Sequence, residues 1–410
     1  MKALTKKNLI LIFSFLFLFA SLTSVAAETN LQYWTLFSGG EGDYMSSMVE
    51  EFNQSHPDIT VEEQRQPWGE YYQKLTTAMA GGNAPDIAIM HTDRLPTFVA
   101  KGTLYSLDGF LDKLDEDDFA NRLFEGGKYK GHQYAVPLDT HPYILFYNKQ
   151  VLREAGLTKN GEVKVPSTVS ELNKFSSTIE KKTDFRGMAW GNSWQAWWSF
   201  YSQLNGQFLT EEGKPAFNNS KGLKATKALK SLITKGGARF ETPYNQRNTL
   251  FKNGKIGFKP DGVWNVGPFH KALGSDLGIT LFPVVKGGER ANWANSHNFV
   301  LPKQPQKDSE KLSAAFEFIR WVTAHSSKWA EAGHIPARIS IRQSDKVLDL
   351  PLRQEYVKAA DIASYPPSIV NWVGINSTVT DTLDLVAKKG KTAKSILSLM
   401  KKRVKQQLEE

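Results

Sequence analysis

The chain has 410 residues, no cysteine and a formal net charge of +9. This length is more than one hydrophobic core usually fills, so we expect two lobes. The lack of cysteine excludes disulfides, thiol chemistry and a lipid-modified cysteine. Three lysines stand before residue 28 and eight basic residues lie between Lys388 and Glu410, so the rest of the chain is close to neutral. The charge therefore does not indicate a nucleic acid partner.

The first 27 residues have the pattern of a secretory signal peptide. The three lysines precede an apolar run from Leu9 to Ala20, and Val25-Ala26-Ala27 offers small residues for cleavage before Glu28. The apolar run is short for a membrane span. We therefore expect a periplasmic protein that begins at Glu28 and carries no lipid anchor. An uncleaved membrane anchor is the alternative.

Strand and helix patterns alternate in the first part of the mature chain. Residues 31–36 predict a strand, residues 38–42 a loop, and residues from Asp43 on a helix whose cap is Asp43. A second strand begins near residue 57, a helix runs from 69 to 80, and residues 85–90 predict a buried strand. The alternation predicts an α/β fold with ligands beyond the carboxyl ends of the strands.

Three later helices are marked by their first residues or by their apolar face. Thr168 and Glu171 form a capping-box pattern, and a long helix begins near Asp308. Near the carboxyl end, apolar residues from Ile396 to Leu408 line one face of a helix and lysines the other. We expect this helix to close a lobe. Binding to a membrane surface is the alternative, which the narrow apolar stripe disfavours.

A polar hinge separates two apolar, strand-like runs at residues 131–139 and 143–149. Asp139 and His141 emerge there at strand ends, where a ligand could bind. A return crossing is expected at Asn295-Ser296. Since no linker sequence separates the lobes, the chain is expected to cross between them more than once.

Several segments, taken in order, resemble the bacterial solute-binding proteins of ABC sugar importers, the maltose-binding-protein-like family. They are Phe52-Asn53, Gly81 to Ile87, the hinge with its Tyr147-Asn148, Pro166 to Leu172 (with Val169 where the family has Trp), Phe251 to Gly257 with Gly262-Val263-Trp264, and Gly333 to Arg338. The resemblance covers nearly the whole mature chain.

This resemblance implies a two-lobed periplasmic-binding-protein fold, with two α/β domains around a hinge and cleft. We expect lobe 1 to comprise residues 28–138 plus 296–336, and lobe 2 residues 139–295 plus 337–410. The implied function is capture of a carbohydrate, with an oligosaccharide expected, and its delivery to the permease of an ABC transporter. The lobes of such a protein close by hinge rotation. A monomer without enzymatic activity is expected.

The candidate ligand-binding residues lie at predicted strand ends, in loops or at the crossings. They are Ser38, Glu41, Trp68, Asp93, Asp139, His141, Trp194, Trp264, Trp293, His297, Arg338 and Trp372. Indole rings stack on the apolar faces of sugars, and the polar groups pair with hydroxyls. Trp264 carries the strongest expectation, because the family's Gly-x-Trp element lies at the cleft. Core packing is the alternative for each other tryptophan, whose context is mostly loop-like, and helix capping or solvent contact for the polar residues.

Three other functions are weighed against this one. His141 and His297 could be metal ligands, but no His, Cys or Asp cluster has ligand spacing, so neither a metal nor another cofactor is expected. A glycoside hydrolase needs a pair of carboxylates. Glu41, Asp93 and Asp139 supply carboxylates, but no spacing marks a pair. A secreted lectin is the remaining alternative, and it would bind sugar without closing.

Overall fold

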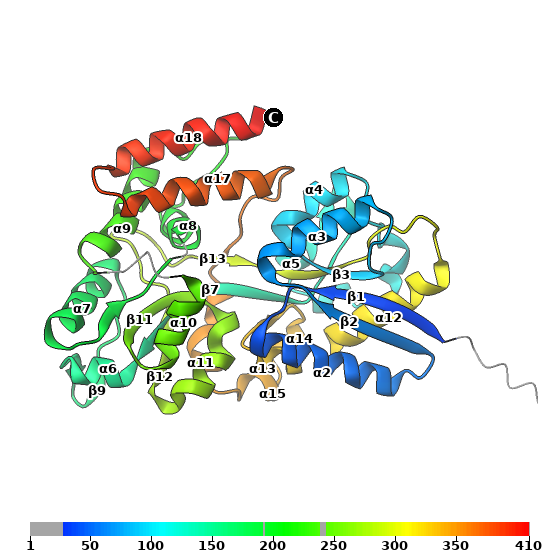
Figure 1. Cartoon of the computed structure of the whole chain (residues 1–410), viewed down its shortest axis with the longest axis horizontal. Helices are drawn as coiled ribbons and strands as arrows, with labels where there is room; N and C mark the ends of the chain where they lie inside the picture. Colours follow the sequence, from blue (N-terminus) through cyan, green and yellow to red (C-terminus); the bar gives the residue numbers. More distant parts are fainter. Residues whose placement is uncertain (1–27, 192, 238–242, 410) are drawn as a thin grey trace, which may run out of the picture.

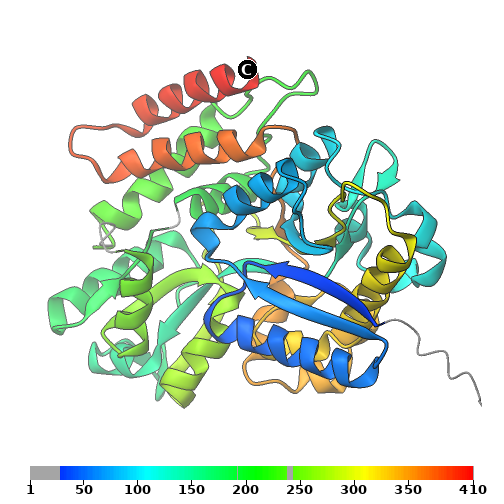
Figure 2. The ribbon, with the colours of Figure 1, turned by 45° about the vertical axis from the view of Figure 1, so that its right-hand side comes forward.

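The structure, a computed structural model, describes residues 28–191, 193–237 and 243–409. The expected signal peptide, residues 1–27, lies outside the described residues. Two large β-sheets organise the chain, one on each side of the molecule (Figure 1). We call the part built on the first sheet lobe 1 and the part built on the second sheet lobe 2. Figure 2 shows the same two halves from another side.

The sheet of lobe 1 has the strand order β2-β1-β3-β14-β6. Strand β1 runs parallel to β2 and β3, and β14 runs antiparallel to β3 and β6. The strands of this lobe are β1 (Thr29–Thr35), β2 (Ile59–Arg65), β3 (Ile87–His91), β4 (Lys128–Tyr129), β5 (His132–Gln133), β6 (Val136–Pro137) and β14 (His297–Val300). Its helices are α2 (Gly39–Ser55), α3 (Trp68–Ala80), α4 (Leu95–Ala100), α5 (Asn121–Glu125), α12 (Ser309–Ala324) and α13 (Ser327–Glu331).

The sheet of lobe 2 has the order β10-β11-β7-β13-β16, and β7 also pairs with β12 and β15. The strands of this lobe are β7 (Asp139–Asn148), β8 (Thr158–Lys159), β9 (Glu162–Val163), β10 (Arg186–Met188), β11 (Ile256–Gly262), β12 (Leu277–Leu281), β13 (Asn292–Asn295), β15 (Ile335–Pro336) and β16 (Ala363–Ser364). Its helices are α6 (Lys149–Glu154), α7 (Val169–Lys182), α8 (Ser193–Gln203), α9 (Ser220–Thr234), α10 (Tyr244–Lys252), α11 (Val266–Leu273), α14 (Ile339–Arg342), α15 (Asp345–Leu348), α16 (Arg353–Tyr356), α17 (Trp372–Asp384) and α18 (Ala393–Glu409).

Each lobe has its own hydrophobic core. The core of lobe 1 draws its buried side chains from residues 31–138 and 299–337. Two clusters form the core of lobe 2, and both use residues of β7.

Among residues 28–191, 193–237 and 243–409, no helix has the length and apolar character that crossing a bilayer requires.

Three segments cross between the lobes: residues 138–139, residues 295–297 and residues 333–336. Strand β7 is buried over all ten of its residues and lies between the two halves (Figure 1). Near its start, His141 is in register with Asn295 and Asp139 with Pro336, so the three crossings lie side by side. The multiple crossing that the missing linker predicts is confirmed.

The capping signals predict two helices correctly and a third incorrectly. The Thr168 hydroxyl accepts a hydrogen bond from the Glu171 backbone N–H at 3.2 Å, and Asp308 caps α12. The expected loop at residues 38–42 with a cap at Asp43 is wrong, because α2 begins at Gly39 and Ser38 is its cap. The Glu41 carboxylate accepts a hydrogen bond from the Ser38 backbone N–H, which stabilises this earlier start despite the two glycines.

The loop-like context expected for the tryptophans is also wrong for several of them. Trp194, Trp197 and Trp198 lie in α8 and are buried in the core of lobe 2, and Trp372 begins α17. The Gly, Asn and Ser residues beside these tryptophans favour a loop prediction, although the tryptophans themselves lie in helices. The expected closing helix is confirmed as α18, which buries Ile396, Leu397, Met400 and Val404 against lobe 2.

Candidate ligand-binding cleft and hinge

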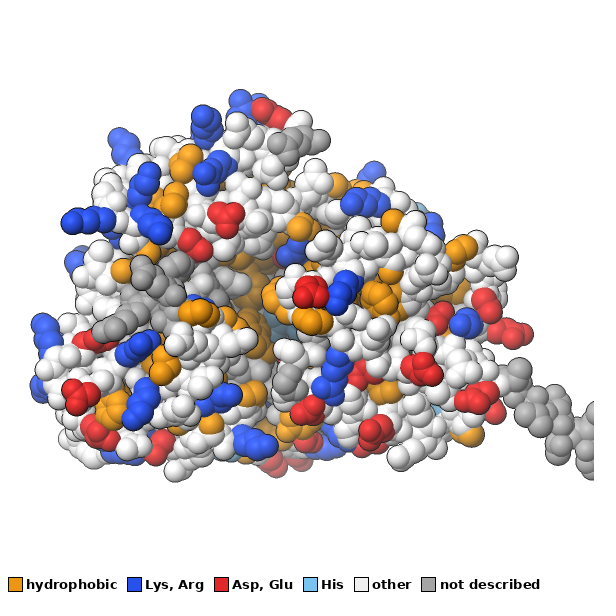
Figure 3. All heavy atoms as spheres, in the orientation of Figure 1, with side chains coloured by type: hydrophobic (Ala, Val, Ile, Leu, Met, Phe, Trp, Pro, Cys, Tyr) orange, Lys and Arg blue, Asp and Glu red, His pale blue; other side chains and the backbone are white. Residues whose placement is uncertain are grey.

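The surface of the molecule is hollowed between the two lobes, and hydrophobic and histidine side chains are visible in the hollow (Figure 3). Strand β3 ends at His91, β7 begins at Asp139 beside the crossings, and β11 ends at Gly262 opposite Tyr143 near the start of β7. The residues at these strand ends are candidates to line this cleft.

A row of aromatic rings connects the lobes. In lobe 1, the Trp68 ring centroid lies 5.1 Å from that of His91, which ends β3. His91 is 5.3 Å from His141 of β7, and His141 is 5.8 Å from Trp264 and 6.1 Å from Trp293 in lobe 2. Trp68 is 52% exposed, while Trp264 is partly buried and Trp293 is buried. We call these five side chains the aromatic row.

Trp264 is held in place by two neighbours. A Cβ added to Gly262 would lie 1.8 Å from the Trp264 ring, so the ring occupies the space that the glycine leaves open. The indole Nε1 donates a hydrogen bond to the Tyr244 hydroxyl at 2.9 Å, and the Asn265 amide donates a second one at 2.9 Å. Burial, followed by the Asp261 charge, raises the pKa of Tyr244. The Gly-x-Trp spacing thus fixes the orientation of the indole.

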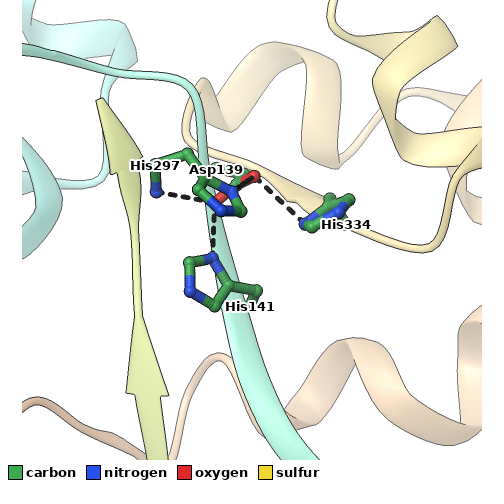
Figure 4. A group of neighbouring side chains, drawn as sticks. All are labelled: Asp139, His141, His297 and His334. Carbon is green, nitrogen blue, oxygen red and sulfur yellow. Dashed lines mark hydrogen bonds and ion pairs between the residues drawn. The ribbon is translucent and has the colours of Figure 1, made fainter. Parts of the chain in front are cut away.

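A carboxylate lies at the point where the three crossings meet. Asp139 is fully buried, and His141, His297 and His334 surround it (Figure 4). Its Oδ1 is 3.0 Å from His141 Nδ1 and its Oδ2 is 2.8 Å from His297 Nδ1 and 3.1 Å from His334 Nδ1. Asp139 also accepts hydrogen bonds from the Trp329 indole at 2.7 Å and the His297 backbone N–H at 3.1 Å. We call Asp139 and its three histidines the hinge cluster.

The hinge cluster concentrates opposite charges in a buried space. Burial raises the pKa of Asp139, but His297 and His334 outweigh it, so the pKa lies well below its ordinary value. Burial lowers the pKa of His334, but Asp139 and Glu41 outweigh it and raise this pKa to about 9. Burial and the neighbouring His297 lower the pKa of His141 to about 3. The surroundings thus favour an anionic Asp139, a positive charge near His334 and a neutral His141.

Other predicted residues lie at the edge of this region. Glu41 Oε2 is 3.0 Å from His334 Nε2, so Glu41 contacts the hinge cluster from α2. Ser38 is exposed beside it. Asp93 is buried and accepts a hydrogen bond at 3.1 Å from the indole of the fully buried Trp372, which joins lobe 1 to lobe 2.

Two further predicted residues make their contacts in other parts of the lobes. Trp194 packs in the core of lobe 2, with its ring centroid 5.5 Å from that of Trp372. Arg338 pairs with Asp118 at 3.0 Å and lies over the Phe119 ring at 4.5 Å.

Four residues of the region were not predicted from the sequence: His91, Tyr244, Trp329 and His334. His91 directly follows a buried strand, and strand-end reasoning alone would have found it. His334 lies in the Gly333 to Arg338 segment of the family resemblance, which could have marked it. Tyr244 and Trp329 are brought in by contacts between distant segments, for which the sequence carries no local signal.

Comparisons with known proteins agree with this architecture. The sequence profile of the family described as bacterial extracellular solute-binding protein matches residues 38–329. The maltotriose-binding protein of Pyrococcus abyssi is 23% identical over 379 residues, which cover 90% of this chain and 80% of that protein. The arabinooligosaccharide-binding protein of Bacillus subtilis is 26% identical over 384 residues, covering 88% and 82%.

Solved structures show the same fold. The GacH receptor of Streptomyces glaucescens has a TM-score of 0.83 at 21% identity, covering 93% of this chain and 99% of the receptor. The maltose-bound MalE3 of T. maritima has a TM-score of 0.82 at 20% identity, covering 92% and 99%. The predicted two-lobed fold is confirmed. Because the family profile matches well over half of the chain, the protein belongs to the bacterial extracellular solute-binding proteins.

Proposed function

We propose that this protein captures a carbohydrate, with an oligosaccharide expected, in the cleft between its lobes and delivers it to the permease of an ABC transporter. The aromatic row carries the proposal, because it offers indole and imidazole rings from both lobes to one elongated ligand. Sugar rings present apolar C–H faces that stack on such side chains. The names of the relatives from Pyrococcus abyssi and Bacillus subtilis support the same ligand class.

The roles of the predicted residues follow from their positions. We assign Trp68 and Trp264 as stacking platforms of the two lobes, and His141 and Trp293 as the floor between them. Asp139 and His297 are assigned to the hinge, since their polar groups bond to one another. Residues 28–138 with 296–336 and residues 139–295 with 337–410 are proposed as the two bodies that rotate on binding. The exception is β15 at the end of the first body, which pairs with β7 and is expected to move with the second.

The carboxylates favour binding over hydrolysis. A glycosidase needs one carboxyl group to transfer a proton and a second to act at the sugar carbon. Asp139 bonds to histidines and to Trp329, Asp93 bonds to Trp372, and Glu41 bonds to His334. We propose that none of the three acts on a glycosidic bond.

We also propose that the protein is secreted, that its signal peptide is removed after Ala27, and that it acts as a monomer.

Thermal-shift measurements on mature protein test the ligand class. The panel contains maltotriose, an arabino-oligosaccharide, diacetylchitobiose and, as a non-sugar, sn-glycerol 3-phosphate. A ligand that binds only the folded protein stabilises it by about 2.7 kcal/mol at a hundred times its Kd. We expect at least one neutral oligosaccharide to raise the melting temperature. A response to sn-glycerol 3-phosphate alone, or release of shorter sugars during incubation, would contradict the proposal.

Trp68 provides a second test with a matched control. Its indole is more than half exposed, so Trp68→Ala should change stability by less than about 0.5 kcal/mol. The affinity for the sugar should nevertheless fall about tenfold, as expected for loss of a stacking platform worth about 1.4 kcal/mol. Trp321→Ala is the control, because Trp321 packs on His325 and Phe52 in lobe 1 outside the aromatic row. Equal affinities of the two variants would exclude Trp68 from the site.

A further inference from the structure

The hinge cluster has the composition of a metal-binding site. Asp139 and His141 come from β7, His297 from β14, and His334 from the segment before β15. Each offers one ligand atom, these atoms lie within 4.8 Å of one another, and all four side chains are buried. We infer that the hinge cluster binds one divalent transition metal ion, of which zinc is the expected member.

Coordination requires small movements of the ligand atoms. Nitrogen and oxygen ligands lie about 2.0–2.2 Å from zinc, so neighbouring ligand atoms of a tetrahedral site are separated by roughly 3.3–3.6 Å. The three Asp139 to histidine separations, 2.8, 3.0 and 3.1 Å, are shorter and must widen by roughly half an ångström. All four ligand atoms already lie within 4.8 Å of one another, and small rotations of the imidazole rings can adjust their separations.

His334 provides an independent observation. It is fully buried, and its Nδ1 has no hydrogen-bond partner although it lies 3.1 Å from Asp139 Oδ2. Its other nitrogen, Nε2, is 3.0 Å from the Glu41 carboxylate. In the neutral imidazole, with its proton on Nε2 toward Glu41, the lone pair of Nδ1 faces the Asp139 oxygen. A bound metal ion would then take the place of the proton that charges His334 in the metal-free protein.

The groups around the cluster are placed to orient its ligand atoms. A histidine that binds metal commonly donates its other N–H to a carboxylate, as His334 can to Glu41. The Asp139 carboxylate is in turn held by the Trp329 indole and the His297 backbone N–H. These contacts fix the direction in which the ligand atoms point.

The ligand set selects the class of metal. Three imidazoles and one carboxylate suit zinc and the neighbouring transition metals, whereas calcium and magnesium prefer oxygen ligands alone. The ion would join all three segments that cross between the lobes. It would therefore fix the hinge rather than take part in chemistry. This inference does not depend on the proposed sugar ligand.

A network of hydrogen bonds with a protonated His334 is the competing description of the same residues. It predicts no preference for a transition metal. The experiment below separates the two descriptions, because only coordination gives a stoichiometric ion and a ligand-field spectrum.

The test uses the untagged mature protein, residues 28–410, purified without added chelator. Elemental mass spectrometry should find about one zinc or related ion per chain. After removal of the ion with dipicolinate, addition of Co²⁺ should give visible absorption bands of a nitrogen and oxygen site, and Zn²⁺ should abolish them. Zinc should also raise the melting temperature of the stripped protein.

Variants assign the ion to the cluster. His297→Gln and His334→Gln should weaken zinc binding at least a hundredfold in competition with a chromophoric chelator. Glu41→Gln, which keeps all four ligands, should weaken it about tenfold. His132→Gln is the matched control, because the exposed His132 pairs with Asp108 away from the cluster and should leave zinc binding unchanged.

The wild-type protein decides the question even where a ligand variant fails to fold. Absence of a stoichiometric ion, together with no cobalt spectrum and no effect of zinc on melting, would overturn the inference. Unchanged zinc affinity in folded His334→Gln protein would do the same. Sugar binding measured on the same samples is a separate readout, so failure of the metal site leaves the proposed function to its own tests.

Discussion

Replacing Trp264 by alanine should separate a ligand platform from a core residue. The indole is partly buried, lies over Gly262 and donates to Tyr244, and its ring centroid is 5.8 Å from that of His141 in the aromatic row. If a sugar stacks on it, Trp264→Ala should weaken binding by about 2 kcal/mol. This corresponds to a loss of about thirtyfold in affinity.

The cost to stability should be smaller than for a core tryptophan. Folding removes the Trp264 indole only partly from water, so its truncation should cost about 1–2 kcal/mol of unfolding free energy. Trp372→Ala is the comparison, because Trp372 is fully buried and should cost about 3–5 kcal/mol. Trp264→Ala should therefore lose more sugar affinity than Trp372→Ala but less unfolding free energy.

Calorimetric titration with the sugar found in the panel, beside urea unfolding, measures both quantities. Trp264→Phe keeps an aromatic face but loses the donor to Tyr244, and it should retain most of the affinity. Normal affinity in a destabilised Trp264→Ala protein would refute the assignment and make Trp264 a core residue.

Four further outcomes are expected. Gly262→Ala should lower sugar affinity about tenfold and cost about 1–2 kcal/mol of stability, because a methyl group there displaces the Trp264 ring from its packing; titration of the folded variant checks this. Trp372→Phe should remove the hydrogen bond to Asp93 between the lobes at a cost of about 1 kcal/mol, measured by urea unfolding. Lys259→Met should cost about 3 kcal/mol, because it leaves its buried partner Asp261 with less compensating charge, and melting curves measure it. Finally, sugar should reduce the radius of gyration in small-angle scattering, and an unchanged radius would favour a lectin that does not close.

The sequence predicts the architecture because its signals are local. Alternating strand and helix patterns and the capping box at Thr168 each involve residues close together in the chain. The expected polar hinge between two strands is wrong in detail, because Asp139 and His141 lie within the continuous strand β7. The error at α2 arises where two local signals conflict, since Gly39 and Gly40 favour a loop while Ser38 and Glu41 cap a helix.

The site is predicted less completely because it is assembled from distant segments. Motifs predict Trp264 and His141 as site residues, and the fold places their ring centroids 5.8 Å apart. Neighbouring residue types alone also predict Trp194, which lies in the core. Local composition does not reveal which face of a helix is buried. A tryptophan on the buried face cannot contact a ligand.

The hinge cluster shows the limit of spacing along the chain as a guide to chemistry. The sequence shows no closely spaced metal ligands, yet Asp139, His297 and His334 meet although up to 195 residues separate them. The reason is topological: β7 pairs with β13 and β15 at the start of lobe 2, so three crossings lie side by side. A buried carboxylate needs donors from its surroundings, and here the surroundings are the crossings themselves. The charge of Asp139 therefore stays compensated only while the crossing segments, and with them the two lobes, keep their relative positions.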